Sequence, residues 1–147
     1  MSEQANQKQL VVFTLGVEHY ALPIGVVNEI IRYAEPRSVA SRTDWVRGVI
    51  SLRGRIVPVY DVAARLGLAS ELTKQSKIVI VEAGAETAGV IVDSVEEVLT
   101  VTDDQIEPAP GADAAMIEAI VRIEDRLIVL LTMGAIFADV AELALAA

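Results

Sequence analysis

Short apolar runs bounded by turn residues recur along almost the whole chain, and they constrain its fold more than any other feature. Val, Ile and Leu dominate these runs, while Gly, Pro, Asp and Glu stand between them. Runs of this length and composition are typical of β-strands. Nine or ten short strands with few helices predict a mainly β fold of the barrel type. The expected strands are residues 10–15, 20–22, 49–52, 56–60, 78–81, 90–92, 95–101, 120–123 and 127–131.

Two of these runs flank Arg53-Gly54-Arg55, which predicts a hairpin with a tight turn. Gly54 can take the positive φ that such a turn needs. Pro58 in the second arm has no N–H to donate to a neighbouring strand, so we expect that arm at a sheet edge or a bulge. The runs 78–81 and 90–92 are apolar at every position, which predicts strands buried on both faces, as in a closed barrel.

Two segments have a helical pattern of apolar residues. In residues 26–33, Val27, Ile30 and Ile31 fall on one face at spacings of three and four, which predicts a short helix that ends before Pro36. A C-terminal helix is expected from a second apolar stripe, formed by Met133, Ile136, Phe137, Val140 and Ala144.

Capping residues predict two further helical turns. Asp61 is suited to cap a helix over residues 61–66, and Gly67 is suited to end it. Thr102 and Gln105 have the spacing of a capping box, so a brief helical turn is expected there.

Composition and charge exclude several classes of protein. The chain has no Cys and one His, which excludes disulfides, thiolate zinc sites and thiol nucleophiles. Its net charge of −9 disfavours binding to bulk nucleic acid, because the phosphate backbone would repel it. No apolar stretch approaches the roughly 20 residues that a membrane-spanning helix needs, and no signal peptide is visible. We therefore expect a soluble, cytoplasmic protein.

The charge is unevenly distributed along the chain. Between Arg32 and Lys77 nine basic residues stand against four acidic ones, whereas the remainder of the chain is strongly acidic. Patches of opposite sign suit docking to more than one protein partner. The charges could equally serve only to keep an apolar core soluble.

No catalytic constellation is found. His19 is alone and cannot form a metal pair, and Ser51 lacks the Gly-x-Ser-x-Gly setting of a hydrolase nucleophile. The segment 84–89 begins like a phosphate loop but lacks the following Lys and Ser/Thr. Trp45 can be a core anchor or an interface residue. The sequence predicts a protein without enzymatic activity, cofactor or metal.

Residues 45–61, Trp-Val-Arg-Gly-Val-Ile-Ser-Leu-Arg-Gly-Arg-Ile-Val-Pro-Val-Tyr-Asp, closely resemble the signature of the CheW family, the coupling proteins of bacterial chemosensory arrays. Further segments are similar to other landmarks of that family: residues 12–16, 20–24, 27–32, 89–93, 106–110 and 125–128. The resemblance covers residues 9–140, which leaves a polar tail over 1–8 and the end of the C-terminal helix over 141–147.

The resemblance implies two intertwined, five-stranded, SH3-like β-barrels that share one core, with short helices and a C-terminal helix. It implies a non-catalytic adaptor that joins the tips of methyl-accepting chemoreceptors to the regulatory domain of a CheA-type histidine kinase. Carried over by position, the partner-contacting residues are Val27, Glu29, Gly48, Arg53 and Val98. Arg53 and Glu29 would line a receptor-facing groove, where Arg53 can offer forked donors to carboxylates.

Simpler roles for these residues stay open. Arg53 could bond only to backbone carbonyls of its turn, Gly48 could serve only a backbone conformation, and Val27 and Val98 could be buried. Two departures from the family pattern, Ser51 in place of Asn and no Pro within 38–44, leave a pilus-type or other sensory pathway as an alternative. A β-barrel that binds a small ligand is a further, less favoured alternative.

Overall fold

A computed structural model describes residues 7–40, 44–109, 116–132 and 134. Eleven strands and one short α-helix fall within them, together with the 3₁₀ turns Ile24–Val26 and Asp103–Gln105. The elements in chain order are β1 Gln7–Leu15, β2 Glu18–Pro23, β3 Val27–Arg32, β4 Val46–Leu52, β5 Arg55–Tyr60, α1 Val62–Leu66, β6 Lys77–Ala83, β7 Glu86–Val92, β8 Ser94–Thr102, β9 Ile106–Glu107, β10 Ile117–Ile123 and β11 Arg126–Leu131.

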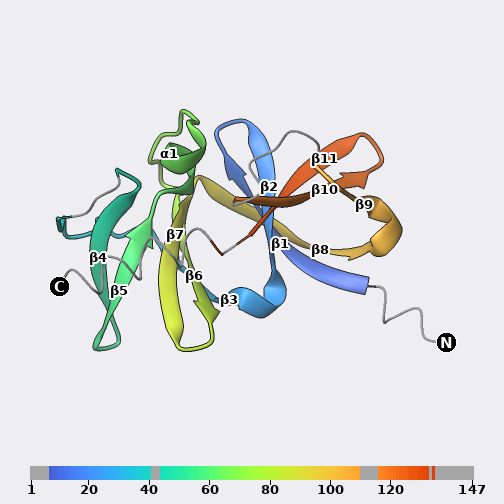
Figure 1. The fold of residues 1–147 in the computed structure, drawn as a ribbon. Coiled ribbons are helices and arrows are strands. Elements are labelled where there is room, and N and C mark those ends of the chain that lie inside the picture. The colour runs from blue at the N-terminus through green and yellow to red at the C-terminus, as the bar shows by residue number, and fades with distance from the viewer. Residues whose placement is uncertain (1–6, 41–43, 110–115, 133, 135–147) are drawn as a thin grey trace.

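The strands form two sheets that repeat one topology (Figure 1). The first sheet has the order β3-β6-β7-β5-β4 and takes the middle of the chain. The second has the order β8-β1-β2-β11-β10-β9 and combines the first and last strands. In each sheet two antiparallel hairpins meet through a parallel contact, β5 with β7 in one and β11 with β2 in the other. The two halves are therefore intertwined along the chain.

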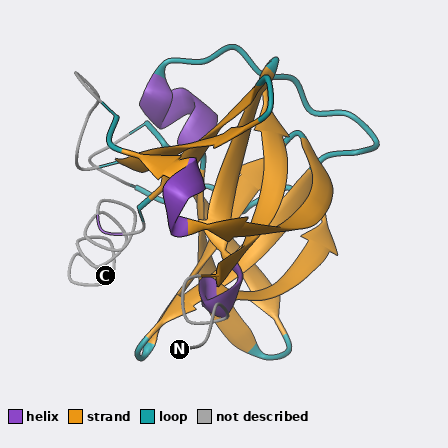
Figure 2. Ribbon diagram, turned by 90° about the vertical axis from the view of Figure 1, so that its right-hand side faces the viewer, coloured by secondary structure: helices purple, strands orange, loops and turns teal. Residues whose placement is uncertain are grey.

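Both sheets close into barrels. In the first, Arg37 forms an isolated bridge with Val49 of β4, and their backbone N–H and C=O groups exchange hydrogen bonds of 2.8 and 2.9 Å. In the second, β9 follows β8 through the 3₁₀ turn and pairs with β10 at the far side of the sheet. Figure 2 shows the strands curving round, with short helical turns between some of them. The expected pair of SH3-like barrels is confirmed.

The apolar side chains gather in three clusters, as alternation along the strands requires. One cluster fills the barrel of β1, β2 and β8–β11, and another fills the barrel of β3–β7. The third combines side chains from both sheets, so it is the shared core. Neighbouring residues on a strand alternate between clusters. On β1, Val12 lies inside its barrel and Phe13 lies in the shared core. On β6, Ile78 lies inside its barrel and Val79 lies in the shared core.

The expected helix over residues 26–33 is wrong, because β3 occupies most of this segment. Its side chains alternate between half-buried and exposed, and the strand pairs with β6. A register shift between Val27 and Glu29 accompanies the pairing. The β-branched residues Val27, Ile30 and Ile31 suit an edge strand, and their helical spacing was misleading.

Pro58 is not at a sheet edge, since β5 is an inner strand between β4 and β7, but it lies next to a register shift of the β4–β5 pair between Val46 and Gly48. Two features of its surroundings make the proline acceptable. The opposing residue, Val49, gives its own N–H and C=O to Arg37, so it requires no hydrogen bond from Pro58. The ladder with β7 begins only at Val59.

The capping predictions are confirmed. Asp61 caps α1 by accepting a hydrogen bond from the backbone N–H of Ala64 at 3.0 Å, and Gly67 ends the helix at φ 73°. The Gln105 side chain accepts from the N–H of Thr102 at 2.9 Å, as a capping box requires. The expected C-terminal helix falls almost wholly outside the described residues. Within them, no helix is long and apolar enough to cross a membrane.

Candidate partner-binding surface

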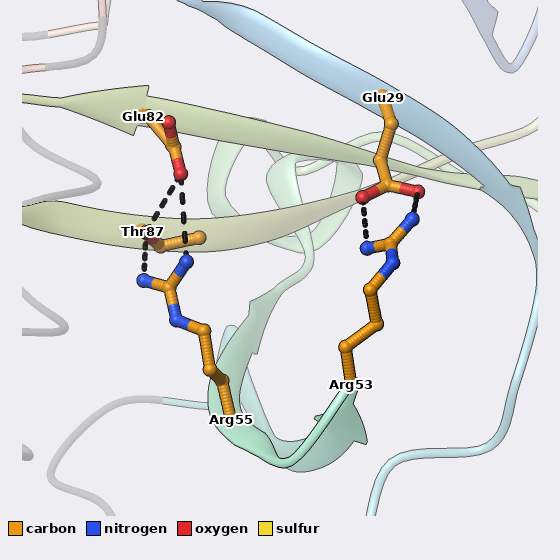
Figure 3. Close-up of polar contacts among 5 residues, drawn as sticks. All are labelled: Glu29, Arg53, Arg55, Glu82 and Thr87. Carbon is orange, nitrogen blue, oxygen red and sulfur yellow. Dashed lines mark hydrogen bonds and ion pairs between the residues drawn. The ribbon is translucent and has the colours of Figure 1, made fainter.

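The tip of the β4–β5 hairpin carries two arginines on either side of Gly54. Arg53 and Gly54 both have positive φ, at 51° and 80°, as the two central residues of a type I′ turn require. Arg53 and Arg55 extend in the same direction from this turn, toward the neighbouring strands (Figure 3). The predicted turn therefore places two cations together at one end of the barrel.

Arg53 and Glu29 form a two-point ion pair. Arg53 donates from Nη1 to Oε2 of Glu29 at 2.5 Å and from Nη2 to Oε1 at 2.6 Å. The two residues come from opposite sides of the five-stranded sheet, Glu29 from β3 and Arg53 from the hairpin that includes β4. The Arg53 side chain is 68% exposed and that of Glu29 24% exposed. The pair therefore spans the end of the barrel at its surface.

Each partner of this pair shifts the titration of the other. The hydrogen bonds from Arg53 hold the pKa of the Glu29 carboxyl below its ordinary value of 4.5, although desolvation acts in the opposite direction. The same hydrogen bonds raise the pKa of Arg53. Both groups are therefore charged at neutral pH, and Arg53 bonds to this carboxylate, in contrast to the alternative in which it bonds only to carbonyls of its turn.

Arg55 makes a weaker set of contacts with β6 and β7. Its Nη2 donates to the hydroxyl of Thr87 at 2.9 Å, and its Nη1 lies 3.7 Å from Oε2 of Glu82. The Thr87 hydroxyl also donates to Glu82 at 3.5 Å. Arg55 thus has one hydrogen bond, to a neutral hydroxyl, and a longer ion pair with Glu82.

A hollow of about 250 Å³ lies between these two arginine contacts. Val57 and Ile80, from the cluster inside the barrel, form its apolar floor with Leu52. Its other lining residues are Asn28, Glu29, Arg53, Arg55, Glu82 and Thr87. An apolar floor within a charged rim suits contact with a protein side chain.

Gly48 has a structural role in the same barrel. Its φ is +146°, and a Cβ on it would lie 2.0 Å from the carbonyl oxygen of Arg37. A glycine is therefore needed where the chain at Arg37 closes the barrel over β4.

The two valines differ in exposure and position. Val27 starts β3 and is half-buried against the shared core. Val98 lies on β8 in the other sheet, opposite Val11, and is 52% exposed. The structure thus brings Glu29 and Arg53 together, with Val27 on the same strand as Glu29, and sets Val98 in the other barrel.

The sequence interpretation missed Arg55, Glu82 and Thr87. The Arg-Gly-Arg pattern at the hairpin tip was the signal that could have drawn attention to Arg55. Its two partners follow from β6 and β7 lying next to the hairpin, which no local pattern reveals.

A second hollow, of about 350 Å³, is lined by residues that include Tyr33, Leu72 and the ion pair Arg47–Asp61. Arg47 donates from Nε to Oδ2 of Asp61 at 3.0 Å. Desolvation, then the charges of Glu35 and Asp61, raise the pKa of Tyr33. Among the residues that the structure describes, no three His, Cys, Asp or Glu side chains are placed to hold a metal ion.

Trp45 lies beside this region. It packs half-buried against the shared core, and the guanidinium of Arg65 lies 5.2 Å from its ring centroid. These contacts favour a core anchor over a residue reserved for an interface.

The sequence of this chain matches the model of a known protein family over both barrels and the β4–β5 hairpin. The family model described as CheW-like domain matches residues 9–141. The chain belongs to the CheW family. This match includes the whole of the rim formed by Glu29, Arg53, Arg55, Glu82 and Thr87, which is therefore part of the family's domain.

Two chemotaxis relatives of this CheW-family chain match over most of their length, and a pilus-type relative matches over less than half of its own. The probable chemotaxis protein CheW of Rhizobium etli is 30% identical over 137 residues, which cover 90% of this chain and 88% of the relative. The chemotaxis protein CheW of Bacillus subtilis is 32% identical over 134 residues, or 88% and 86% of the two chains. Protein PilI of Pseudomonas aeruginosa is 34% identical over only 84 residues, which cover 56% of this chain and 47% of PilI.

A solved structure of a CheW protein is also similar to this chain over most of both lengths. The crystal structure of the scaffolding protein TtCheW from Thermoanaerobacter tengcongensis superposes with a TM-score of 0.83 at 35% identity, covering 88% of this chain and 92% of that one. The near-complete matches favour a chemotaxis scaffold of the CheW type over the pilus-type alternative.

Proposed function

We propose that this CheW-family chain is a cytoplasmic, non-catalytic adaptor that couples the signalling tips of chemoreceptors to a CheA-type histidine kinase. The observation that carries the proposal is the match to a CheW scaffold over 88% of the chain, with a TM-score of 0.83. Such a protein acts by binding, because it holds two partners in a fixed relative position. Two surfaces of ordinary interface size, each burying about 800 Å² of this chain, would suffice.

The residues proposed to form the partner-binding surface, by direct contact or by holding it in place, are Val27, Glu29, Gly48, Arg53 and Val98. Support for the first barrel comes from the exposed Glu29–Arg53 pair beside a hollow with an apolar floor. Support for the second comes from Val98, a large apolar side chain that is 52% exposed on a strand. Exposed apolar residues next to charged groups are typical of protein contact surfaces.

The direct test is binding of the purified chain to two fragments from the same organism: the helical-hairpin tip of a chemoreceptor and the regulatory domain of the kinase. Titration calorimetry should give saturable binding to each, and size-exclusion chromatography should give a ternary complex. Arg53→Glu should weaken binding to the receptor tip while the unfolding temperature stays within a few degrees of the wild type. Failure of the wild-type chain to bind either fragment would overturn the proposal.

A further inference from the structure

The two arginines of the hairpin differ in what they can offer a partner. Both terminal nitrogens of Arg53 already donate to a carboxylate at 2.5 and 2.6 Å. Each terminal nitrogen carries a second N–H, so a carboxylate from another protein could still bind Arg53. It would then lie beside the Glu29 carboxylate, which already neutralises the guanidinium and repels a second negative charge, so it gains little.

Arg55 is paired less closely. Its hydrogen bond goes to a neutral hydroxyl, that of Thr87, and its ion pair with the Glu82 carboxylate is longer, at 3.7 Å, beyond hydrogen-bond distance. Its side chain is 60% exposed. Charge-assisted hydrogen bonds are roughly twice as strong as neutral ones, so moving the guanidinium from the hydroxyl to an incoming carboxylate is favourable. Thr87 would keep its contact with Glu82.

We propose that Arg55 is the residue that binds a carboxylate of the receptor tip, and that Arg53 is a positioning residue that fixes the hairpin through Glu29. This inference rests on the proposed adaptor function. The Glu29–Arg53 pair joins the hairpin tip to β3 and so holds the turn, and with it Arg55, at the rim of the hollow. An apolar side chain next to the receptor carboxylate would then enter the hollow above Val57 and Ile80.

The first arm of the test concerns Arg55 and uses the receptor-tip fragment in titration calorimetry. Arg55→Gln should raise Kd about tenfold to a hundredfold, the effect of losing one charge-assisted hydrogen bond of about 1.5–3 kcal/mol. Its affinity should also depend less steeply on salt than that of the wild type. The matched control is Arg122→Gln, since Arg122 is also paired, with Glu107 at 2.6 Å, and is 57% exposed on β10. The control should bind like the wild type.

The second arm separates a positioning role for Arg53 from a direct contact. The single variants Glu29→Arg and Arg53→Glu should both weaken binding, because each places like charges together. The double variant, in which the two charges are exchanged, restores the ion pair between positions 29 and 53. It should therefore recover an affinity within about threefold of the wild type. Circular dichroism should show that all of the variants are folded.

Three results would decide against the inference or its basis. Wild-type affinity in Arg55→Gln would overturn the role of Arg55, while the adaptor function would stand. A folded exchange variant that stays as weak as Arg53→Glu would mean that Arg53 contacts the receptor directly. If the wild-type chain bound no receptor tip, the proposed function itself would fail, and the inference with it.

Discussion

Gly48 and Arg37 approach so closely that a Cβ on the glycine would lie 2.0 Å from the carbonyl oxygen of Arg37. The contact occurs where Arg37 pairs with Val49 and closes the five-stranded sheet into a barrel. The glycine also takes a φ of +146°, which other residues rarely adopt. Its place within the Trp-to-Asp signature segment is therefore explained by barrel closure, whether or not a partner also contacts it.

Gly48→Ala should destabilise the protein strongly. Backbone strain alone is expected to cost about 1–3 kcal/mol. The overlap with the backbone of Arg37 adds to this cost, because neither backbone segment can move away without breaking its pairing. The unfolding temperature should fall by at least about 2 °C, at about 2–4 °C per kcal/mol for a chain of this size. Gly25→Ala is the control, because a Cβ at position 25 meets no atom within 4 Å. Equal unfolding temperatures for the two variants would contradict this explanation.

The titration of Glu29 should report its contact with Arg53. Because the folded pKa of Glu29 lies below its ordinary value of 4.5, its ion pair stabilises the fold above about pH 4.5. That stabilisation is lost as the pH falls through the folded pKa. A carbon NMR titration of the Glu29 carboxyl should give a midpoint below 4.5 in the wild type and a higher one in Arg53→Gln.

Arg122→Gln serves as the control for this titration, since it removes a different ion pair and should raise the midpoint of Glu107 only. If Arg53→Gln left the Glu29 midpoint unchanged, the two-point contact would not exist in solution.

Asp61→Ala should destabilise the chain through loss of a helix cap. One carboxylate oxygen of Asp61 accepts from the N–H of Ala64 and the other from Nε of Arg47, both at 3.0 Å. Loss of the cap is expected to cost about 0.5–2 kcal/mol. The exposed ion pair is expected to add at most about 1 kcal/mol. Urea denaturation should therefore show a clear shift for Asp61→Ala and a smaller one for Asp61→Asn, which keeps the capping oxygen. A shift for Asp61→Asn as large as that for Asp61→Ala would assign the effect to the charge.

Most strands could be predicted because each needs only a local pattern. Continuous β-branched runs identified β6 and β7, and Arg53-Gly54 identified the turn between β4 and β5. The caps at Asp61 and Thr102 were equally local, since each bonds to a residue three positions away. Where a residue bonds to a near neighbour in the sequence, the sequence alone was sufficient to predict the local structure.

The failures all involve contacts between residues distant in sequence. β3 was interpreted as a helix because Val27, Ile30 and Ile31 have helical spacing. In the strand Ile30 lies on the opposite face and is 41% exposed, and only the pairing with β6 reveals this. Pro58 is acceptable inside the sheet because Arg37 bonds to Val49, which no local pattern shows. Arg55 reaches Thr87, 32 positions further along the chain. The partner-contact residues depended on the family resemblance, because a docking surface made of ordinary charged and apolar side chains has no motif of its own.

Val98→Asp should separate partner binding from stability. Val98 is 52% exposed on β8, so a carboxylate there stays hydrated and the free energy of unfolding should change by less than about 1 kcal/mol. In a complex the same carboxylate would be buried without a partner, which is expected to cost at least about 1–3 kcal/mol. Binding to the receptor tip, to the kinase regulatory domain or to both should therefore weaken about tenfold or more in calorimetry.

The control for this change is Val17→Asp, at a residue that is 92% exposed in the turn between β1 and β2. It introduces the same charge into the same barrel, so it corrects for a general effect of added negative charge on association. Wild-type affinity of Val98→Asp for both fragments would remove Val98 from the contact surface. Because Val98 and Arg53 lie in different barrels, that result would leave the proposed role of the β4–β5 hairpin untouched.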